Sequence, residues 1–279
     1  MVKIVTDTTS DLPPQLAQEL GVSIVPLLVR FGTETYRDGV DINTEDFYRR
    51  LTESNVLPTT SAPGPGVFAE LFTSLARETD EILAIMLSEK YSVIHESACQ
   101  GKDMVKANCR IEVIDSMSAI GGEMLLVLSA AKAAQKGASL EQISDMVKKA
   151  IPRTHVRMSF DTLEYLKRGG RIGKAQALLG SLLKINPIVG IKDGETFPYG
   201  RVRSRAQAMD FLVNFVKGFP KIEGLVIEDA TTPDELEMLA ERIGNAFPKE
   251  RTYQAKVGSV VGTHVGPHVL AVSVLEAEQ

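Results

Sequence analysis

Short polar side chains gather where the first apolar run of the chain ends. The residues Val2 to Val5 are followed closely by Asp7-Thr8-Thr9-Ser10-Asp11. The carboxyl ends of parallel strands line the ligand crevice of an open α/β sheet, so these side chains are candidates for ligand contacts. The alternative is that Ser10 or Asp11 only caps a helix that begins near Pro13. Spacing alone leaves both interpretations open.

A second group of hydroxyls, Thr59, Thr60 and Ser61, lies in a turn rich in proline and glycine. An amphipathic helix is expected directly after it, over 67–75. Hydroxyls and free backbone N–H groups at a helix N-terminus favour an anion such as a phosphate or a carboxylate. An ordinary loop with a Ser or Thr cap would explain the same pattern.

The apolar run over 82–87 also ends in hydroxyls, Ser88 and Ser92, ahead of a predicted helix through Ile94. Two strand ends with the same chemistry predict one shared pocket. A further predicted strand, over 111–114, ends in Asp115 and Ser116. These two side chains could tie neighbouring loops together by hydrogen bonds instead of touching a ligand.

Basic side chains crowd around glycines in the segment LEYLKRGGRIG, over 163–173. Glycine lets backbones approach closely, which invites comparison with nucleotide-binding loops. The segment lacks the GxxxxGK[ST] and GxGxxG orders and follows a predicted helix instead of a strand, so both assignments are rejected. Near the C-terminus, His264 is flanked by Gly262 and Gly266. A histidine held there could donate to an anion, although single histidines are more often structural.

The elements that must position these residues follow an α/β pattern in the first half of the chain. Short apolar runs over 2–5, 24–29, 82–87 and 111–114 alternate with segments of helical periodicity, which predicts parallel βαβ units. Pro13 and Pro14 favour a helix start, and Ser139 with Gln142 predicts a capping box. Gly21 and Gly137 have the positions of helix stops.

The second half shows a hairpin signal, Asp193-Gly194, and helical periodicity over 206–216 and 233–247. Residues 160–191 contain two helix-like pieces split by Gly169-Gly170 and Gly173. We therefore predict an α/β fold with an N-terminal parallel-sheet α/β/α domain over 1–155. A C-terminal α/β domain with a mixed or antiparallel sheet is expected over 156–279.

Composition excludes several classes of function. The 279 residues are 44% hydrophobic and carry a formal charge of −5 from interspersed acids and bases, so the clustered positive face of a nucleic-acid-binding protein is not expected. Cys99 and Cys109 form neither a CxxC motif nor a disulfide framework, which favours a reducing cytoplasm. Neither a signal peptide nor an apolar stretch of about 18 residues is apparent, so stable membrane insertion is not expected.

Four motifs, taken together, resemble the DegV family over essentially the whole chain. They are DTTSDLP near the start, PTTSAP near position 60, LExLKRGGRIG near 170 and VGTHVGPHVLAV near the end. The resemblance implies two α/β domains with a long-chain fatty acid, such as palmitate, stearate or oleate, bound at the seam between them. It also implies a cytoplasmic carrier without cofactor, metal or catalytic residues. Its partner would be a fatty acid kinase, which makes the acyl phosphate for phospholipid synthesis.

The resemblance also implies the residues around the ligand's carboxylate. Thr60, Ser61 and Ser92 would bind it, and His264 would lie beside it. The polar network around the head group would include Arg171 and Arg203.

One stretch departs from the family pattern. The family sequence after the third strand is close to SSGLSGTYQSA, whereas residues 88–98 read SEKYSVIHESA. Ser92 is retained, but its flanking glycines are not, and Lys90, Tyr91 and Val93 restrict the backbone beside the head group. We therefore expect the pose or chain preference of the ligand to differ. Ala62 also stands where glutamine is common.

Three other functions compete with a lipid carrier. A hydrolase would use Ser92 or Ser61 as nucleophile and His264 as base, but KYSVI around Ser92 lacks the GxSxG turn. A kinase-related role would need a Gly-Lys phosphate loop and carboxylates for magnesium, and neither is apparent. A regulatory interaction protein that binds no lipid stays open.

Overall fold

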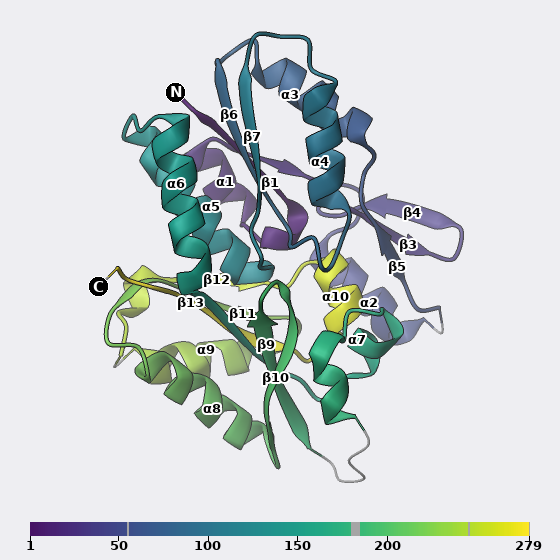
Figure 1. The fold of residues 1–279 in the computed structure, drawn as a ribbon. Helices are drawn as coiled ribbons and strands as arrows, with labels where there is room; N and C mark the ends of the chain where they lie inside the picture. Colours follow the sequence, from purple (N-terminus) through teal and green to yellow (C-terminus); the bar gives the residue numbers. More distant parts are fainter. Residues whose placement is uncertain (55, 180–184, 245, 279) are drawn as a thin grey trace.

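The chain folds into three sheets with helices packed against them (Figure 1). The computed structural model describes residues 1–54, 56–179, 185–244 and 246–278. A parallel sheet and a small antiparallel sheet come from the first half of the chain, and a larger mixed sheet comes from the second half. The α/β class and the predicted change of sheet type between the two halves are confirmed.

The first sheet is parallel throughout and has the order β2-β1-β6-β7. Its strands are β1 (Lys3–Asp7), β2 (Val22–Val25), β6 (Glu81–Met86) and β7 (Arg110–Asp115). One predicted strand, over 24–29, was wrong as a single element. It is divided at Pro26, which has no N–H to donate, and the chain after it enters a different sheet.

Alternate residues of β6 face opposite helical layers, as the two-residue period of a strand requires. Ile82, Ala84 and Met86 pack with α3 (Pro65–Leu75) and α4 (Ile94–Asp103). Leu83 and Ile85 pack with α1 (Pro14–Leu20), α5 (Ile120–Gln135) and α6 (Leu140–Ala150). The Ser139–Gln142 capping box at the start of α6 is confirmed, and Gly21 and Gly137 adopt the positive φ of helix stops.

The small antiparallel sheet was not predicted. It has the order β4-β3-β5, with β3 (Leu28–Phe31), β4 (Glu34–Arg37) and β5 (Thr59–Ser61), and α2 (Thr44–Glu53) lies between β4 and β5 in the sequence. The hydroxyls expected in a turn therefore belong to a strand, in which Val29 pairs with Thr60 and Leu28 pairs with Ser61. Because α3 begins only at Pro65, after Gly64 as its N-cap, these hydroxyls do not cap that helix.

The third sheet is mixed and has the order β10-β9-β8-β13-β11-β12. Its strands are β8 (Thr154–Ser159), β9 (Asn186–Lys192), β10 (Glu195–Val202), β11 (Ile222–Asp229), β12 (Thr252–Lys256) and β13 (Leu270–Glu276). The Asp193-Gly194 hairpin is confirmed: both residues have positive φ, of 53° and 78°, between β9 and β10.

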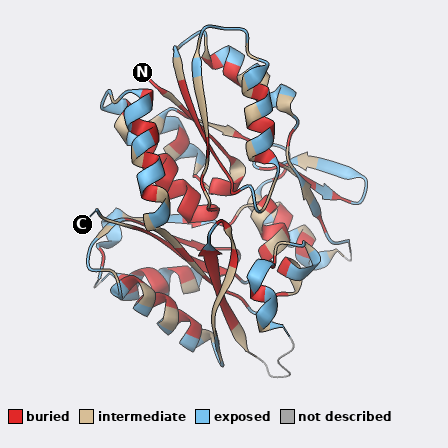
Figure 2. Cartoon of the chain, viewed as in Figure 1, coloured by how far each residue is buried: buried red, intermediate tan, exposed pale blue. Residues whose placement is uncertain are grey.

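Helices cover both faces of the mixed sheet. Helices α8 (Arg205–Lys217) and α9 (Pro233–Ile243) pack on one face, against Leu225 and Ile227 among others. On the other face, Val226 and Leu275 share a core with α5. Figure 2 shows α5 buried along most of its length, and it contacts strands of both the parallel and the mixed sheet.

Short helical elements complete the fold. They are η1 (Thr8–Ser10), η2 (Ile151–Arg153), α7 (Glu164–Arg168), η3 (Gly173–Leu178), η4 (Lys249–Arg251) and α10 (Ser259–Val265). The glycine-rich segment follows α7, as predicted, and the next helix-like piece begins as η3. The rest of that piece, 180–184, lies outside the described residues. Among the residues that the structure describes, no helix combines the length and the apolar character that a membrane span requires.

Candidate functional site

A cavity of about 530 Å³ lies where the first and second halves of the chain meet. This volume falls within the range of small-molecule binding sites. Residues from β5, the loop after β6, the start of α5, β9 and α10 line it. The elements that carried most of the candidate polar residues in the sequence therefore converge on one cavity.

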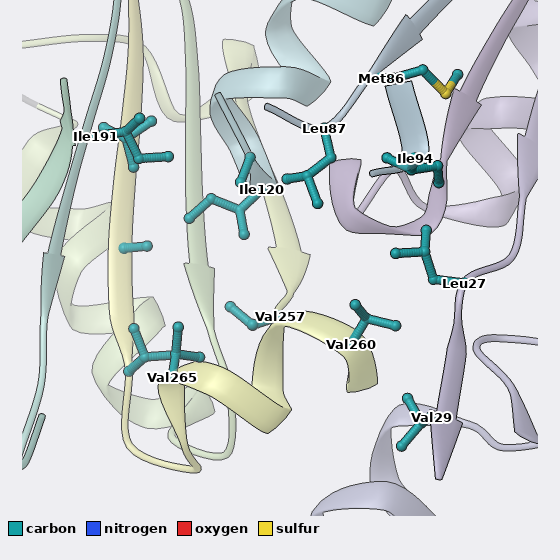
Figure 3. Close-up of a cluster of buried hydrophobic side chains, with 14 of the residues drawn as sticks. Leu27, Val29, Met86, Leu87, Ile94, Ile120, Ile191, Val257, Val260 and Val265 are labelled. Carbon is teal, nitrogen blue, oxygen red and sulfur yellow. The ribbon is translucent and has the colours of Figure 1, made fainter. Parts of the chain in front are cut away.

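Most of the cavity wall is apolar. Figure 3 shows Leu27, Leu87 and Ile120 from the first half of the chain, with Ile191 and Val265 from the second half, in the hydrophobic cluster around this region. The other apolar residues of the wall are Ala62, Val93, Ala119, Met158, Leu166, Val260 and Val261. Such a wall suits an aliphatic chain, because burial of each apolar group against it is favourable.

Polar side chains gather around Thr60 and His264, which β5 and α10 bring together. The Thr60 hydroxyl lies 2.9 Å from Nε2 of His264. Gly169 packs against the other side of the imidazole, since a Cβ there would lie only 2.1 Å from Nδ1. Gly169, the first glycine of the GGRIG motif, is therefore required because any side chain at this position would overlap the imidazole of His264.

His264 is neutral in this environment. Burial, together with the smaller effect of the nearby Arg171 guanidinium, lowers its pKa to about 4. Nδ1 is buried without a hydrogen-bond partner among the described residues. An unpaired acceptor is less costly to bury than an unpaired donor, so we place the proton on Nε2, where it is donated to Thr60. The Thr60 hydroxyl can then give its own proton to an anion.

Arg171 supplies the positive charge at this polar end. Its Nε donates to the backbone oxygen of Tyr91 at 3.1 Å, and its Nη1 donates to the backbone oxygen of Gly169 at 2.7 Å. Ser61 and Ser92 also line the cavity. The Ser92 hydroxyl accepts from the N–H of Ile94 at 3.3 Å, so it also satisfies a donor at the start of α4.

Five of the six predicted binding residues therefore line one cavity, and the sixth does not. Arg203 is exposed between β10 and α8, where its backbone N–H donates to the Gln207 side chain. Its place at the end of the hairpin keeps it away from the cavity wall. We leave it out of the head-group network.

The other motifs act mainly in structure. The alternative that Ser10 or Asp11 caps the helix near Pro13 was wrong, because α1 follows Pro13 as its N-cap and has no side-chain cap bond. Asp7 instead caps the short turn η1 by accepting from Thr9, and it also accepts from the N–H of Leu87. The Asp115 carboxylate accepts from the N–H of Met117 and the Ser116 hydroxyl donates to the backbone oxygen of Ser118, so these bonds brace their own loop and do not join two neighbouring loops. Thr9 is the residue of the first motif that lines the cavity.

Sequence reasoning missed Thr196, which also lines the cavity and bonds to Tyr91 and Arg171. A signal for it existed. The Asp193-Gly194 turn fixes the register of the hairpin, and Thr196 is paired with Ile191 across it. Paired residues share a face, so Thr196 belongs beside the apolar residues of the cavity.

The atypical segment 88–94 adopts its path without glycine. The described non-glycine residues with positive φ are Asp11, Met117, Ile120 and Asp193, and none of them lies in this segment. The lost glycines therefore leave no backbone strain there. Ile120, by contrast, is a β-branched residue with a φ of 49° at the cavity wall, a strained conformation.

The geometry gives little support to catalysis. His264 pairs with Thr60, and in the described part of the chain no serine hydroxyl is hydrogen-bonded to it. No group of three His, Cys, Asp or Glu side chains with metal-binding geometry occurs among residues 1–54, 56–179, 185–244 and 246–278.

Comparisons with known proteins point to one family. A family model described as uncharacterised proteins of the DegV family matches residues 1–277. A DegV domain-containing protein of Caldanaerobacter subterraneus is 37% identical over 276 residues, 97% of each chain. The solved structure of a fatty-acid-binding DegV family protein from Thermus thermophilus has a TM-score of 0.91 and 31% identity, covering 99% of each chain. That of DegV, a fatty acid binding protein from Bacillus subtilis, has a TM-score of 0.89 and 28% identity, again over 99% of each chain.

Proposed function

The chain belongs to the DegV family, and from that premise we propose that it binds one long-chain fatty acid in the cavity between its two halves. The acyl chain would occupy the apolar part, and the carboxylate would lie at the end formed by Thr60, Arg171 and His264. The observation that carries the proposal is this cavity, apolar over most of its wall and polar at one end. The similar proteins from Thermus thermophilus and Bacillus subtilis, whose structures are described as fatty-acid-binding, support it.

Each part of the ligand would contribute differently. Burial of the acyl chain supplies most of the affinity, at about 0.8 kcal/mol per CH₂ group. The carboxylate would otherwise lose its hydration, so it needs several donors within reach. Arg171 offers a charge-assisted bond, and the Thr60 hydroxyl and the hydroxyl of Ser61 offer two more. Ser92 would add to them, although its hydroxyl already accepts from Ile94.

We propose further that the protein carries the fatty acid without altering it and presents it to a fatty acid kinase. The absence of a Ser–His pair in the described residues favours a carrier over a hydrolase. The kinase partner rests on the resemblance to the family. The domain boundary near residue 155 also remains our proposal, supported by the start of β8 at Thr154.

The experiment is to purify the protein from a bacterial host, denature it, extract it with organic solvent and identify the released molecules by mass spectrometry. We expect one long-chain fatty acid, such as palmitate, stearate or oleate, at close to one per chain. The loaded protein is then given to a fatty acid kinase with ATP, and acyl phosphate is expected. Absence of lipid, together with failed reloading by several fatty acids, would favour a regulatory interaction protein instead.

A further inference from the structure

Arg171 is held by segments that lie far apart in the sequence. Its side chain donates to the backbone oxygens of Tyr91 and Gly169. Its own backbone oxygen accepts from the Thr196 hydroxyl at 2.7 Å. The loop after β6, the glycine-rich segment and strand β10 therefore meet at one arginine.

The direction of each hydrogen bond can be worked out. The Thr196 hydroxyl has a single proton, which it gives to Arg171, so the Tyr91 phenol must be the donor in the 3.1 Å contact between the two hydroxyls. Burial raises the pKa of the Tyr91 phenol, which therefore keeps this proton at neutral pH. The bonds form a closed ring of contacts through Tyr91, Thr196 and Arg171, and the two successive hydroxyl bonds, from Tyr91 to Thr196 and from Thr196 to the backbone of Arg171, polarise one another.

This ring leaves one edge of the guanidinium available. Arginine has five N–H donors, and the side-chain bonds to Tyr91 and Gly169 use Nε and Nη1. Nη2 has no protein partner among the described residues, and Arg171 lines the cavity. A carboxylate is recognised best by a guanidinium of fixed orientation, because less side-chain freedom is lost on binding.

We propose that Tyr91 and Thr196 are positioning residues, which hold Arg171 in the orientation that receives the carboxylate and so make the cavity selective for fatty acids over uncharged lipids. This inference rests on the proposed function and deepens it. The Tyr91 phenol holds the Thr196 hydroxyl, which in turn holds the backbone oxygen of Arg171, while the backbone oxygen of Tyr91 holds Nε of the guanidinium.

A purely structural role would be to dock the β9–β10 hairpin onto the loop after β6. A separate contact already does this. The Ser88 hydroxyl donates to the backbone oxygen of Gly194 at 2.8 Å, at the tip of the hairpin. Removal of the phenol oxygen alone should therefore leave the hairpin docked and the chain folded.

The test compares two ligands of equal chain length, palmitate and 1-hexadecanol, on the wild-type chain and Tyr91→Phe. We expect palmitate affinity to fall by about three- to tenfold, as loss of one hydrogen bond predicts, and hexadecanol affinity to stay unchanged. Thr196→Val should show the same selective loss. In an Arg171→Lys background, Tyr91→Phe should have no further effect, because the guanidinium it positions is gone.

Tyr36→Phe is the matched control, since it also removes a hydrogen-bonded phenol, one that accepts from Arg50 and lies away from the cavity wall. It should leave both affinities unchanged. Unchanged palmitate affinity in Tyr91→Phe and Thr196→Val would overturn the inference, as would an equal loss for both ligands. If Tyr91→Phe does not fold, Thr196→Val alone decides between these outcomes. A wild-type chain that binds neither lipid would overturn the proposed function instead.

Discussion

Thr60 and His264 are 204 positions apart, yet their hydrogen bond is central to the polar end of the cavity. With the proton on Nε2, His264 donates to the Thr60 hydroxyl, and the hydroxyl is free to donate to a carboxylate. The depressed pKa of His264, about 4, keeps the imidazole neutral through the physiological range. The pair therefore offers a directed donor and not a second positive charge.

Thr60→Val tests this pair, because valine keeps the shape of threonine and removes the hydroxyl. A hydrogen bond to a charged group contributes about 1.5–3 kcal/mol, so palmitate affinity should fall about tenfold or more. The measurement is titration of the delipidated protein with palmitate. Thr59→Val is the control, since Thr59 is exposed and lies outside the cavity wall. Equal affinities for the two variants would remove Thr60 from the site.

At the scale of residues, the sequence identified most of the site residues but few of the hydrogen bonds that join them. Thr60 and Ser61 stood in a turn rich in proline and glycine, Ser92 followed an apolar run, and His264 and Arg171 lay among glycines, so their types and positions were visible. The ring through Tyr91 and Thr196 depends on hydroxyl directions across three distant segments, which no local pattern encodes. Arg203 is basic and near the hairpin, but strand β10 carries it away from the cavity.

The elements show a similar division between local and distant information. The βαβ alternation, the capping box and the Asp193-Gly194 hairpin are local signals, and they predicted their elements correctly except for the run over 24–29, which Pro26 divides between two sheets. The antiparallel sheet β4-β3-β5 depends on pairing between Val29 and Thr60, which are far apart in the sequence. Strand β5 has only three residues, too few for a period of two to be recognised.

Gly169→Ala tests how the glycine-rich segment serves the site. Gly169 has a φ of −73°, so alanine causes no backbone strain, but its Cβ would lie 2.1 Å from Nδ1 of His264. The imidazole must move away from Thr60, and we expect palmitate affinity to fall at least about tenfold. Overpacking should also lower the free energy of unfolding by about 1–3 kcal/mol. Lipid titration measures the palmitate affinity, and urea unfolding measures the free energy of unfolding.

Gly66→Ala is the control, because this exposed glycine of α3 has open space around it. Alanine there should stabilise the helix by about 0.5–1 kcal/mol and leave binding unchanged. If Gly169→Ala bound palmitate as tightly as the wild type, the packing of the glycine against His264 would have no part in recognition.

At the scale of the molecule, buried carboxyl groups collect where the halves meet. Burial raises the pKa of Asp7, Asp38 and Glu123, and it raises that of Glu228 to about 8. Asp11 is raised as well, by burial and by the negative charge of Glu228. The Asp11 and Glu228 side chains each have a buried oxygen without a partner among the described residues. Retained protons limit the repulsion between these groups.

The free energy of unfolding should therefore depend on pH. A carboxyl with a higher pKa in the folded chain binds its proton more tightly there, so its stabilising effect is complete at low pH. For Glu228 the effect is lost between about pH 4.5 and 8, at about 1.4 kcal/mol per pH unit. Glu228→Gln should flatten this dependence in urea unfolding across that window. Glu241→Gln is the control, because Glu241 is exposed, and its free energy of unfolding should depend on pH as that of the wild type does. The same pH dependence in Glu228→Gln would contradict a raised pKa at Glu228.

Helix α5 determines how a lipid can be admitted. Its side chains belong to a core shared by the parallel and the mixed sheet, so the two halves are not hinged bodies with a cleft between them. To part them would expose an almost wholly apolar helix to water, at about 25 cal/mol for each Å² uncovered. The loops over the cavity are joined instead by individual hydrogen bonds, such as those of Ser88 with Gly194 and of Tyr91 with Thr196. We therefore expect the ligand to enter and leave by movement of these loops, while the parallel and the mixed sheet stay packed together through α5.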